Sequence, residues 1–399
     1  MWILLASVLC FKMREWSYLI FAAAGVGVAA LKGFLYAHVL GEIEYAAIGY
    51  YLLALGVGGL LVGSGVILRA HSELPSMELA QRFLFVAQGR TVGFAFWLLL
   101  SLPSVIAGSL LWDFSLTLLT QVQVLVMFLF TLDVVARKSD GDFLGYARAV
   151  FLRNLLLLFG GLAAAYLTGS AWFSILAEVV LGFFACGTTV VNWVLNFRLP
   201  DVDYVRRCFS FIPVSLLGGL GQYVDRLCAS FFLPAVVFSA YSYLSLLMVG
   251  ALAIQQIVNT KVITLLAVRC KESPRDAFAY LLKVSGGVFL IALLLMACAA
   301  YVLFFSWFSA SWVSVDIIVV VLFVLGVSCR AAEFFSSFLI VMHKKKLLAW
   351  IQFVGLFVYA ILSVISYSSG FVPFVVSMVS GMIFFTAVLA LVSWRVSFA

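Results

Sequence analysis

The chain has 399 residues, of which 65% are hydrophobic and only 10% are charged. A soluble domain has about half apolar and about a quarter charged residues, so this chain has too little polar surface to coat a water-facing globule. The formal net charge of +7 does not indicate a nucleic-acid binder, because such proteins cluster their basic residues on one surface and here they are spaced along the chain.

Long apolar runs predict about twelve transmembrane helices. A helix needs about 20 apolar residues to cross the hydrocarbon of a bilayer, whereas a membrane-spanning strand needs about ten in alternation. The runs have the helical length and do not alternate, so we expect an all-α integral membrane protein. The expected spans are residues 16–37, 45–67, 91–111, 115–135, 148–167, 172–194, 209–232, 236–258, 279–303, 315–341, 347–367 and 372–394.

The beginning of the chain does not resemble a secretory signal. Its first apolar residues precede Lys12 and Arg14, whereas a signal peptide has its positive charge first. Met13 would start a more conventional first span. We therefore expect residues 1–12 to be either an over-extended start or a flexible leader.

The basic residues predict the orientation in the membrane. The leader, the connections after every second span and the C-terminal end contain 21 of the 24 Lys and Arg residues, with Arg69, Arg90 and Arg153 counted among them. The opposite loops contain none. Positively charged loops stay in the cytoplasm, so we expect both termini to be cytoplasmic.

The opposite loops that can be placed best are very short, so we expect no domain outside the bilayer. A weak internal repeat with an offset of 193 residues aligns Leu40–Ala47 with Leu233–Ala240. Repeated halves with a site between them recur in transporters. We therefore expect two six-helix bundles, residues 1–200 and 201–399.

A charge in the middle of a span costs about 2.5–3.5 kcal/mol on insertion scales and often marks function. Arg330 and Glu333 are three residues apart and are expected to share a helix face, as a structural pair or as functional groups. Asp225 and Arg226 are adjacent and should point in different directions. Lys32 is near the outer end of its span, where it would either snorkel or line a cavity. The sixth such residue, Glu178, would be either interfacial or functional.

Nothing in the sequence predicts catalysis. Seven cysteines and three histidines are scattered, and we find no metal-ligand spacing, nucleophile elbow or phosphate-binding glycine loop. We therefore expect a protein that is not an enzyme and has no cofactor or metal.

Two passages resemble the polysaccharide (O-antigen/oligosaccharide-lipid) flippases of the multidrug/oligosaccharidyl-lipid/polysaccharide (MOP) transporter superfamily. Residues 32–46 contain Leu-Gly-Glu-Ile-Glu-Tyr-Ala, similar to the family's turn after the first span. Residues 223–242 contain an Asp-Arg pair followed by Tyr-Ser at the start of the eighth span. Ala46 stands where the family has glycine, and Ser239-Ala240 precede Tyr241.

The resemblance implies two bundles around a central cavity in the bacterial inner membrane. The substrate would be a polyprenyl-diphosphate-linked oligosaccharide, flipped from the cytoplasmic to the outer leaflet for surface polysaccharide biosynthesis. Lys32, Arg226 and Arg330 would bind it, because cations in a low-dielectric cavity attract a diphosphate strongly. Asp225, Glu333 and Glu178 would couple transport to an ion or form structural pairs. Expected partners are this substrate, membrane lipids and glycan polymerase or export machinery, but no nucleic acid.

Two other functions are compatible with the sequence. An ion-driven drug or metabolite exporter of the same superfamily would favour a site centred on carboxylates, and the embedded basic residues argue against it. A membrane glycan polymerase or acyltransferase would need a larger outer loop than this chain offers.

Overall fold

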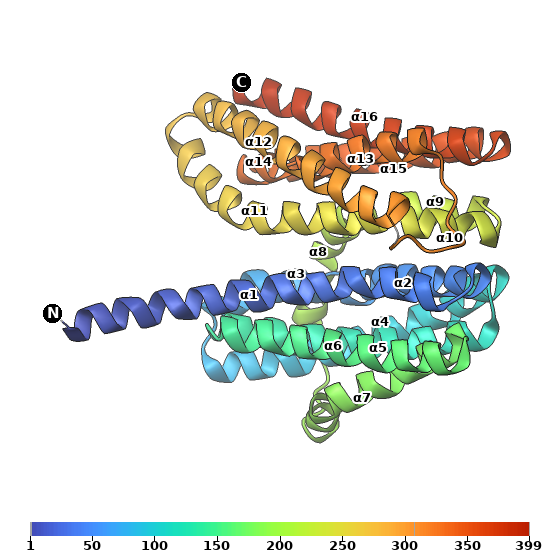
Figure 1. The fold of residues 1–399 in the computed structure, drawn as a ribbon. Helices are drawn as coiled ribbons and strands as arrows, with labels where there is room; N and C mark the ends of the chain where they lie inside the picture. Colours follow the sequence, from blue (N-terminus) through green and yellow to red (C-terminus); the bar gives the residue numbers. More distant parts are fainter. Residues whose placement is uncertain (1, 307, 399) are drawn as a thin grey trace. The chain divides into compact units, whose positions relative to one another are not determined.

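The structure is a computed structural model that describes residues 2–306 and 308–398, and it covers their side chains except for those of residues 2–16, 19, 26, 76, 111, 214, 260, 261, 264 and 267. The described chain is helical and contains no strand, which confirms the predicted all-α fold class (Figure 1). The leader expected at residues 1–12 lies outside the described side chains and stays a prediction.

The helices of the first part of the chain are α1 (Trp2–Val39), α2 (Glu42–Gly63), α3 (Val66–Glu73), η1 (Leu74–Ser76), α4 (Leu79–Leu111), α5 (Phe114–Ser139), α6 (Phe143–Thr168), α7 (Ala171–Leu195) and α8 (Val202–Leu220). The helices of the second part are α9 (Val224–Phe232), α10 (Ala235–Leu244), α11 (Leu246–Glu272), α12 (Pro274–Ala300), the π-helical turn η2 (Tyr301–Phe305), α13 (Ile317–Ala331), α14 (Phe335–Val341), α15 (Lys345–Ser366), η3 (Tyr367–Ser369) and α16 (Phe371–Phe398).

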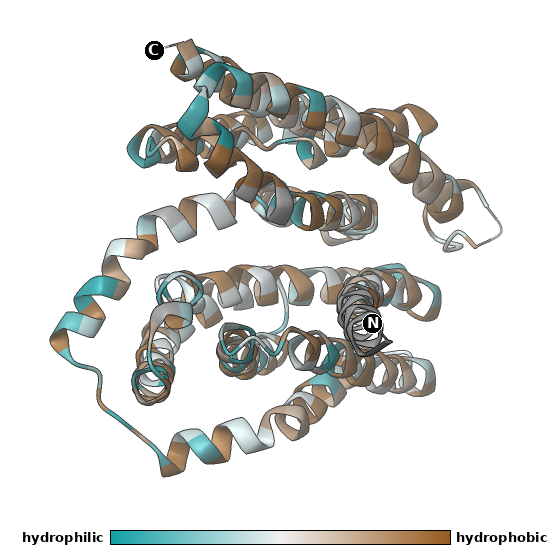
Figure 2. Ribbon diagram, turned by 90° about the vertical axis from the view of Figure 1, so that its left-hand side faces the viewer, coloured by the Kyte–Doolittle hydropathy of each residue, from teal (hydrophilic) through white to brown (hydrophobic). Residues whose placement is uncertain are grey.

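Eleven helical segments in the described chain are long and apolar enough to cross a membrane. The remaining expected span, residues 209–232, is divided between α8 and α9, and the first turns of α8 are charged. Apolar residues dominate the helices, as Figure 2 shows. The chain is thus a multi-pass membrane protein with about twelve spans, as predicted.

Several helices, α4 and α6 among them, begin earlier than the sequence predicts. Helix α4 begins at Leu79 instead of residue 91, and α6 begins at Phe143 instead of residue 148. Charge-free runs place the start of α4 too late, because its first turns, residues 79–90, contain Arg82 and Arg90. Because Arg90 donates to Asp133 of α5 at 2.5 Å, its charge is neutralised inside the helical bundle.

Four of the expected spans are interrupted. The breaks lie between α2 and α3, α8 and α9, α10 and α11, and α13 and α14. At the first break Gly65 has a φ of +79°, and a Cβ on it would lie 2.3 Å from the carbonyl oxygen of Cys208. Glycine is therefore required there both by the backbone conformation and by the close approach of α8.

The chain divides into two compact units, the first ending at Leu216 and the second beginning at Leu217. The division lies within α8, whereas the expected boundary follows residue 200. The start of α8 is fixed to the first unit because buried Arg69 donates to the carbonyl of Tyr204 at 3.1 Å, and Tyr204 donates to that of Phe85 at 3.1 Å. Arg69 was counted among the loop cations, and its burial corrects that assignment.

Each unit has its own packed helices. In the first unit α6 packs against α1 and α7, and α5 packs against α4 and α7. In the second unit α16 packs against α13 and α15, and α12 packs against α11 and α13. Its core includes Leu266, Leu281, Phe334, Phe338 and Leu389, all fully buried.

Helix ends follow the internal repeat where its motifs lie. Helices α1 and α9 end at Val39 and Phe232, and α2 and α10 begin at Glu42 and Ala235. Both pairs of ends are separated by the same 193 residues as the sequence repeat. The turn after the first span and the turn after the seventh are therefore built alike.

Candidate functional site

The first unit contains a buried charge cluster around Glu178 of α7. Lys32 of α1 forms an ion pair with this carboxylate. Tyr36 of α1 donates to its Oε1 at 2.5 Å, and Tyr51 of α2 donates to its Oε2 at 2.8 Å. Glu178 is fully buried and Lys32 is 9% exposed. The cluster therefore joins three helices through one carboxylate that accepts from three donors.

This pairing gives Lys32 a partner that the sequence did not indicate. The two residues are 146 positions apart, so no helical spacing signals the contact. The tyrosines were also missed, although Tyr36 is one helical turn from Lys32. An ammonium group that is already paired with a carboxylate is a weaker candidate for substrate binding than an unpaired one. The role of Lys32 in substrate binding stays a prediction.

Gly161 of α6 makes room for this cluster. A Cβ at this position would lie 2.0 Å from the Tyr36 hydroxyl and 2.8 Å from Glu178 Oε1. Any larger side chain would therefore displace the tyrosine or the carboxylate. Here glycine is needed for close approach and not for a special backbone conformation.

Arg153 of α6 is a buried cation that the charge pattern assigns to a cytoplasmic connection. The structure corrects this, since Arg153 is 7% exposed in the third turn of α6. Its guanidinium lies 4.8 Å from the ring centre of Phe130. Its Nε has no hydrogen-bond partner within the described chain.

In the second unit Asp225 and Arg226 follow the break between α8 and α9, and they have different partners. Tyr241 of α10 donates to Asp225 Oδ2 at 3.1 Å. Arg226 lies over the ring of Tyr223 at 5.0 Å and reaches the carbonyl of Gln222 at 3.4 Å. Its Nε is buried without a partner among the described residues. Arg226 thus has no carboxylate partner among the described residues.

Arg330 and Glu333 pair as their spacing suggests, with Arg330 Nη1 at 3.1 Å from Glu333 Oε2. They do not share a continuous helix face, which corrects that expectation. Helix α13 ends at Ala331, and Glu333 lies in the break before α14. There its Oε1 accepts from the backbone N–H of Ser336 at 2.8 Å. Glu333 therefore satisfies a free amide at the start of α14 as well as neutralising Arg330.

The three candidate carboxylates have different surroundings. Lys32 neutralises Glu178 and Arg330 neutralises Glu333. Asp225 is 3% exposed and has no cationic partner within the described residues. An ionisable residue inside a membrane protein often marks a substrate or ion pathway, so Asp225 stays a candidate for ion coupling.

The described residues contain no group of three or more His, Cys, Asp or Glu side chains that could hold a metal ion. The functional groups that the described residues bring together are instead buried cations, carboxylates and tyrosine hydroxyls, several of them beside helix interruptions. Broken helices with charged groups beside them are typical of substrate and ion sites in transporters.

No protein-family model and no curated protein sequence matches the chain significantly. Several solved structures match it in fold. The lipid II flippase MurJ in an inward closed conformation matches with a TM-score of 0.68 at 13% identity, covering 96% of this chain and 87% of that one. A MOP superfamily transporter from Pyrococcus furiosus, described as having a binding pocket of reverse polarity, has a TM-score of 0.60 at 16% identity, with 97% and 96% covered. A multidrug resistance MATE family transporter in an outward-facing conformation has a TM-score of 0.54 at 16% identity, again with 97% and 96% of the two chains covered.

The chain therefore has the fold of the MOP superfamily transporters. The likeness extends over nearly its whole length, to flippase and drug transporter structures alike.

Proposed function

We propose that this protein flips a polyprenyl-diphosphate-linked oligosaccharide from the cytoplasmic to the outer leaflet by alternating access. The observation that carries the proposal is Arg226, a guanidinium beside a helix break with no carboxylate partner in the described chain. A cation inside a membrane protein is costly unless an anion meets it during function. A diphosphate supplies that anion.

A diphosphate suits Arg226 better than a cationic drug does. Guanidinium groups bind phosphate oxygens in bidentate geometry, and the attraction is stronger away from bulk water. A cationic drug would instead need a free carboxylate. Two of the three buried candidates, Glu178 and Glu333, are already neutralised. The fold likeness to a lipid II flippase supports the same class of substrate.

Lys32 and Arg330 have secondary roles in this proposal. Each has a carboxylate partner, so each meets the substrate only if its ion pair opens. We assign the principal phosphate contact to Arg226. The oligosaccharide would lie in a water-filled cavity, and the polyprenyl chain would remain in the lipid.

Binding of a short analogue tests this assignment. The purified protein is titrated with farnesyl diphosphate, and its thermal unfolding is followed by tryptophan fluorescence. We expect the ligand to raise the melting temperature of the wild type and of Lys345→Gln, an exposed control, but not that of Arg226→Gln. An equal rise in Arg226→Gln would remove Arg226 from the site.

A second candidate function, an ion-coupled exporter of drugs or metabolites, is favoured by Asp225, the buried carboxylate without a counter-charge. The same titration with a lipophilic cation separates the two functions. Stabilisation by the cation, lost in Asp225→Asn and retained in Arg226→Gln, would favour the exporter. Under the flippase proposal Asp225 serves to couple transport to a proton, and Asp225→Asn leaves diphosphate binding intact.

A further inference from the structure

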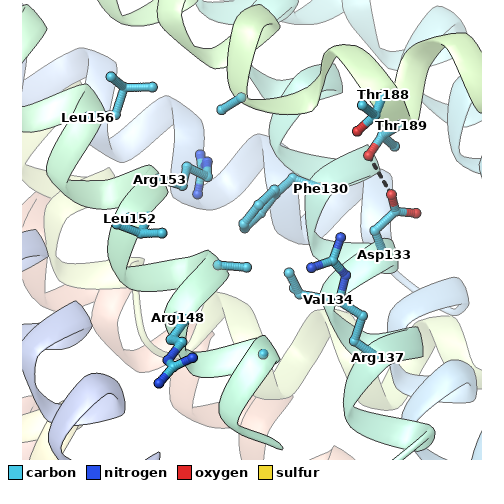
Figure 3. A pocket seen from close by; sticks show the side chains of 13 residues that line it. Phe130, Asp133, Val134, Arg137, Arg148, Leu152, Arg153, Leu156, Thr188 and Thr189 are labelled. Carbon is cyan, nitrogen blue, oxygen red and sulfur yellow. Dashed lines mark hydrogen bonds between the residues drawn. The ribbon is translucent and has the colours of Figure 1, made fainter. Parts of the chain in front are cut away.

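The first unit has a second basic site that the proposed transport function does not use. A cavity of about 510 Å³ lies among α5, α6 and α7 and is lined by Arg137, Arg148 and Arg153. Its size falls within the range of small-molecule and headgroup pockets. In Figure 3 the guanidinium groups of Arg137 and Arg153 point toward the space around Phe130, and Arg148 lies on the first turns of α6.

The lining of this cavity offers its arginines no free carboxylate among the described residues. Its lining contains one carboxylate, Asp133, which is held by Arg90 at 2.5 Å and accepts from Thr189. None of the three lining arginines forms an ion pair among the described residues. Only 7% of Arg153 is exposed, and its Nε has no hydrogen-bond partner among the described residues. The cavity therefore has the electrostatics of an anion site.

The walls of the cavity show where the anion would come from. Leu152 and Leu156 line it from α6, and they are 59% and 40% exposed. Exposed leucines on a helix that spans a bilayer offer an apolar surface to lipid chains. Arg137 and Arg148 flank the α5–α6 connection, which the charge pattern places on the cytoplasmic side. The cavity thus combines basic groups at one membrane surface with an apolar wall that continues along the helix.

We propose that this cavity binds the phosphate of an anionic phospholipid from the cytoplasmic leaflet. The phosphate would lie between Arg137 and Arg153, with Arg148 at the edge, and an acyl chain would follow Leu152 and Leu156. Basic pockets between transmembrane helices on the cytoplasmic side suit such headgroups. The bound lipid would supply the counter-charge that Arg153 lacks and would tie α5 to α6.

A lipid titration tests the proposal independently of the transported substrate. The protein in neutral detergent is titrated with phosphatidylglycerol, phosphatidylcholine or inorganic phosphate, and its melting temperature is recorded. We expect stabilisation by phosphatidylglycerol alone. The double variant Arg137→Gln/Arg148→Gln should bind it about thirtyfold more weakly, since each surface arginine contributes roughly a fivefold factor.

The matched control is Arg206→Gln/Arg207→Gln, which removes the same charge from two exposed positions of α8 and should bind phosphatidylglycerol like the wild type. Equal stabilisation by phosphatidylcholine would show that charge is not recognised and would overturn the proposal. Equal stabilisation by inorganic phosphate would overturn the lipid assignment. Retained affinity in Arg137→Gln/Arg148→Gln, or an equal loss in the α8 control, would also contradict it.

Discussion

At the scale of single residues, Glu178 holds three helices of the first unit together by accepting from Lys32, Tyr36 and Tyr51. Removing one partner of a buried ion pair leaves an uncompensated charge and costs about 3–5 kcal/mol. We expect Lys32→Met to lower the melting temperature and the membrane abundance sharply. The double variant Lys32→Met/Glu178→Gln should recover most of both, because the amide still accepts from a tyrosine. If the double variant is as unstable as Lys32→Met, then Lys32 does not stabilise the protein through its ion pair with Glu178.

Gly161 tests the geometry of the same cluster without changing any charge. A methyl group at this position would lie 2.0 Å from the Tyr36 hydroxyl, so Tyr36 must move and its hydrogen bond to Glu178 must break. We expect Gly161→Ala to destabilise the protein by about 1–3 kcal/mol, the usual cost of overpacking. Gly187→Ala on α7 is the control, since a Cβ there meets nothing within 4 Å. Equal melting temperatures for the two variants would contradict the placement of Tyr36.

The sequence indicates which charges are embedded but not which of them meet. The cost of a membrane charge singles out Lys32 and Glu178 individually, yet their pairing depends on how α1 packs against its neighbours. Arg153 was missed for a different reason. It lies within the expected span 148–167 but close behind Arg137, Lys138 and Arg148, so the charge pattern assigns it to the cytoplasmic connection, whereas in the structure it is buried in α6. Only the three-residue spacing of Arg330 and Glu333 allowed a pair to be predicted.

At the scale of helices, the break between α13 and α14 depends on Glu333. Its carboxylate pairs with Arg330 and accepts from the amide of Ser336. We expect Arg330→Leu to reduce folded protein in the membrane, because Glu333 is then left buried without a counter-charge. Arg330→Leu/Glu333→Gln should restore it, since glutamine keeps an oxygen for Ser336. Arg330→Leu/Glu333→Leu should recover less, because that amide then has no acceptor. Equal abundance of both double variants would show that the contact to Ser336 is dispensable.

Helix positions are largely predictable from apolar runs, while interruptions and true ends are not. The length of an apolar run does not distinguish one continuous helix from two consecutive helices such as α10 and α11. The break at Gly65 is set by the approach of Cys208 from α8, a contact between distant segments. The early start of α4, at Leu79, is compatible with the bundle because Asp133 neutralises Arg90. Both features follow from tertiary contacts that local propensity cannot contain.

At the scale of the whole molecule, the alternation of basic connections predicts that both termini face the cytoplasm. In a background whose seven cysteines are replaced by alanine, we expect Ser369→Cys to react with an impermeant maleimide in intact cells. Glu272→Cys should react only after the cells are permeabilised. Both positions are exposed, so access differs only by side. Labelling of position 272 in intact cells would reverse the orientation.

The class of integral membrane proteins follows from the composition, since a chain with so few charged residues cannot cover a water-facing surface. The repeat predicts two six-helix halves that meet at residue 200, whereas the two compact units divide within α8, because Arg69 and Tyr204 attach its start to the first unit. The substrate is the furthest inference from the sequence, because it depends on the surroundings of one residue, Arg226, and on the fold.

Flipping in a defined membrane tests that inference most directly. The protein is reconstituted in liposomes with a fluorescent polyprenyl-diphosphate oligosaccharide, and movement between leaflets is followed by quenching with an impermeant reductant. We predict that wild type and the exposed control Lys345→Gln move the lipid faster than empty liposomes do, whereas Arg226→Gln, although folded, does not. Equal rates for wild-type and empty liposomes, or full activity of Arg226→Gln, would contradict the proposal.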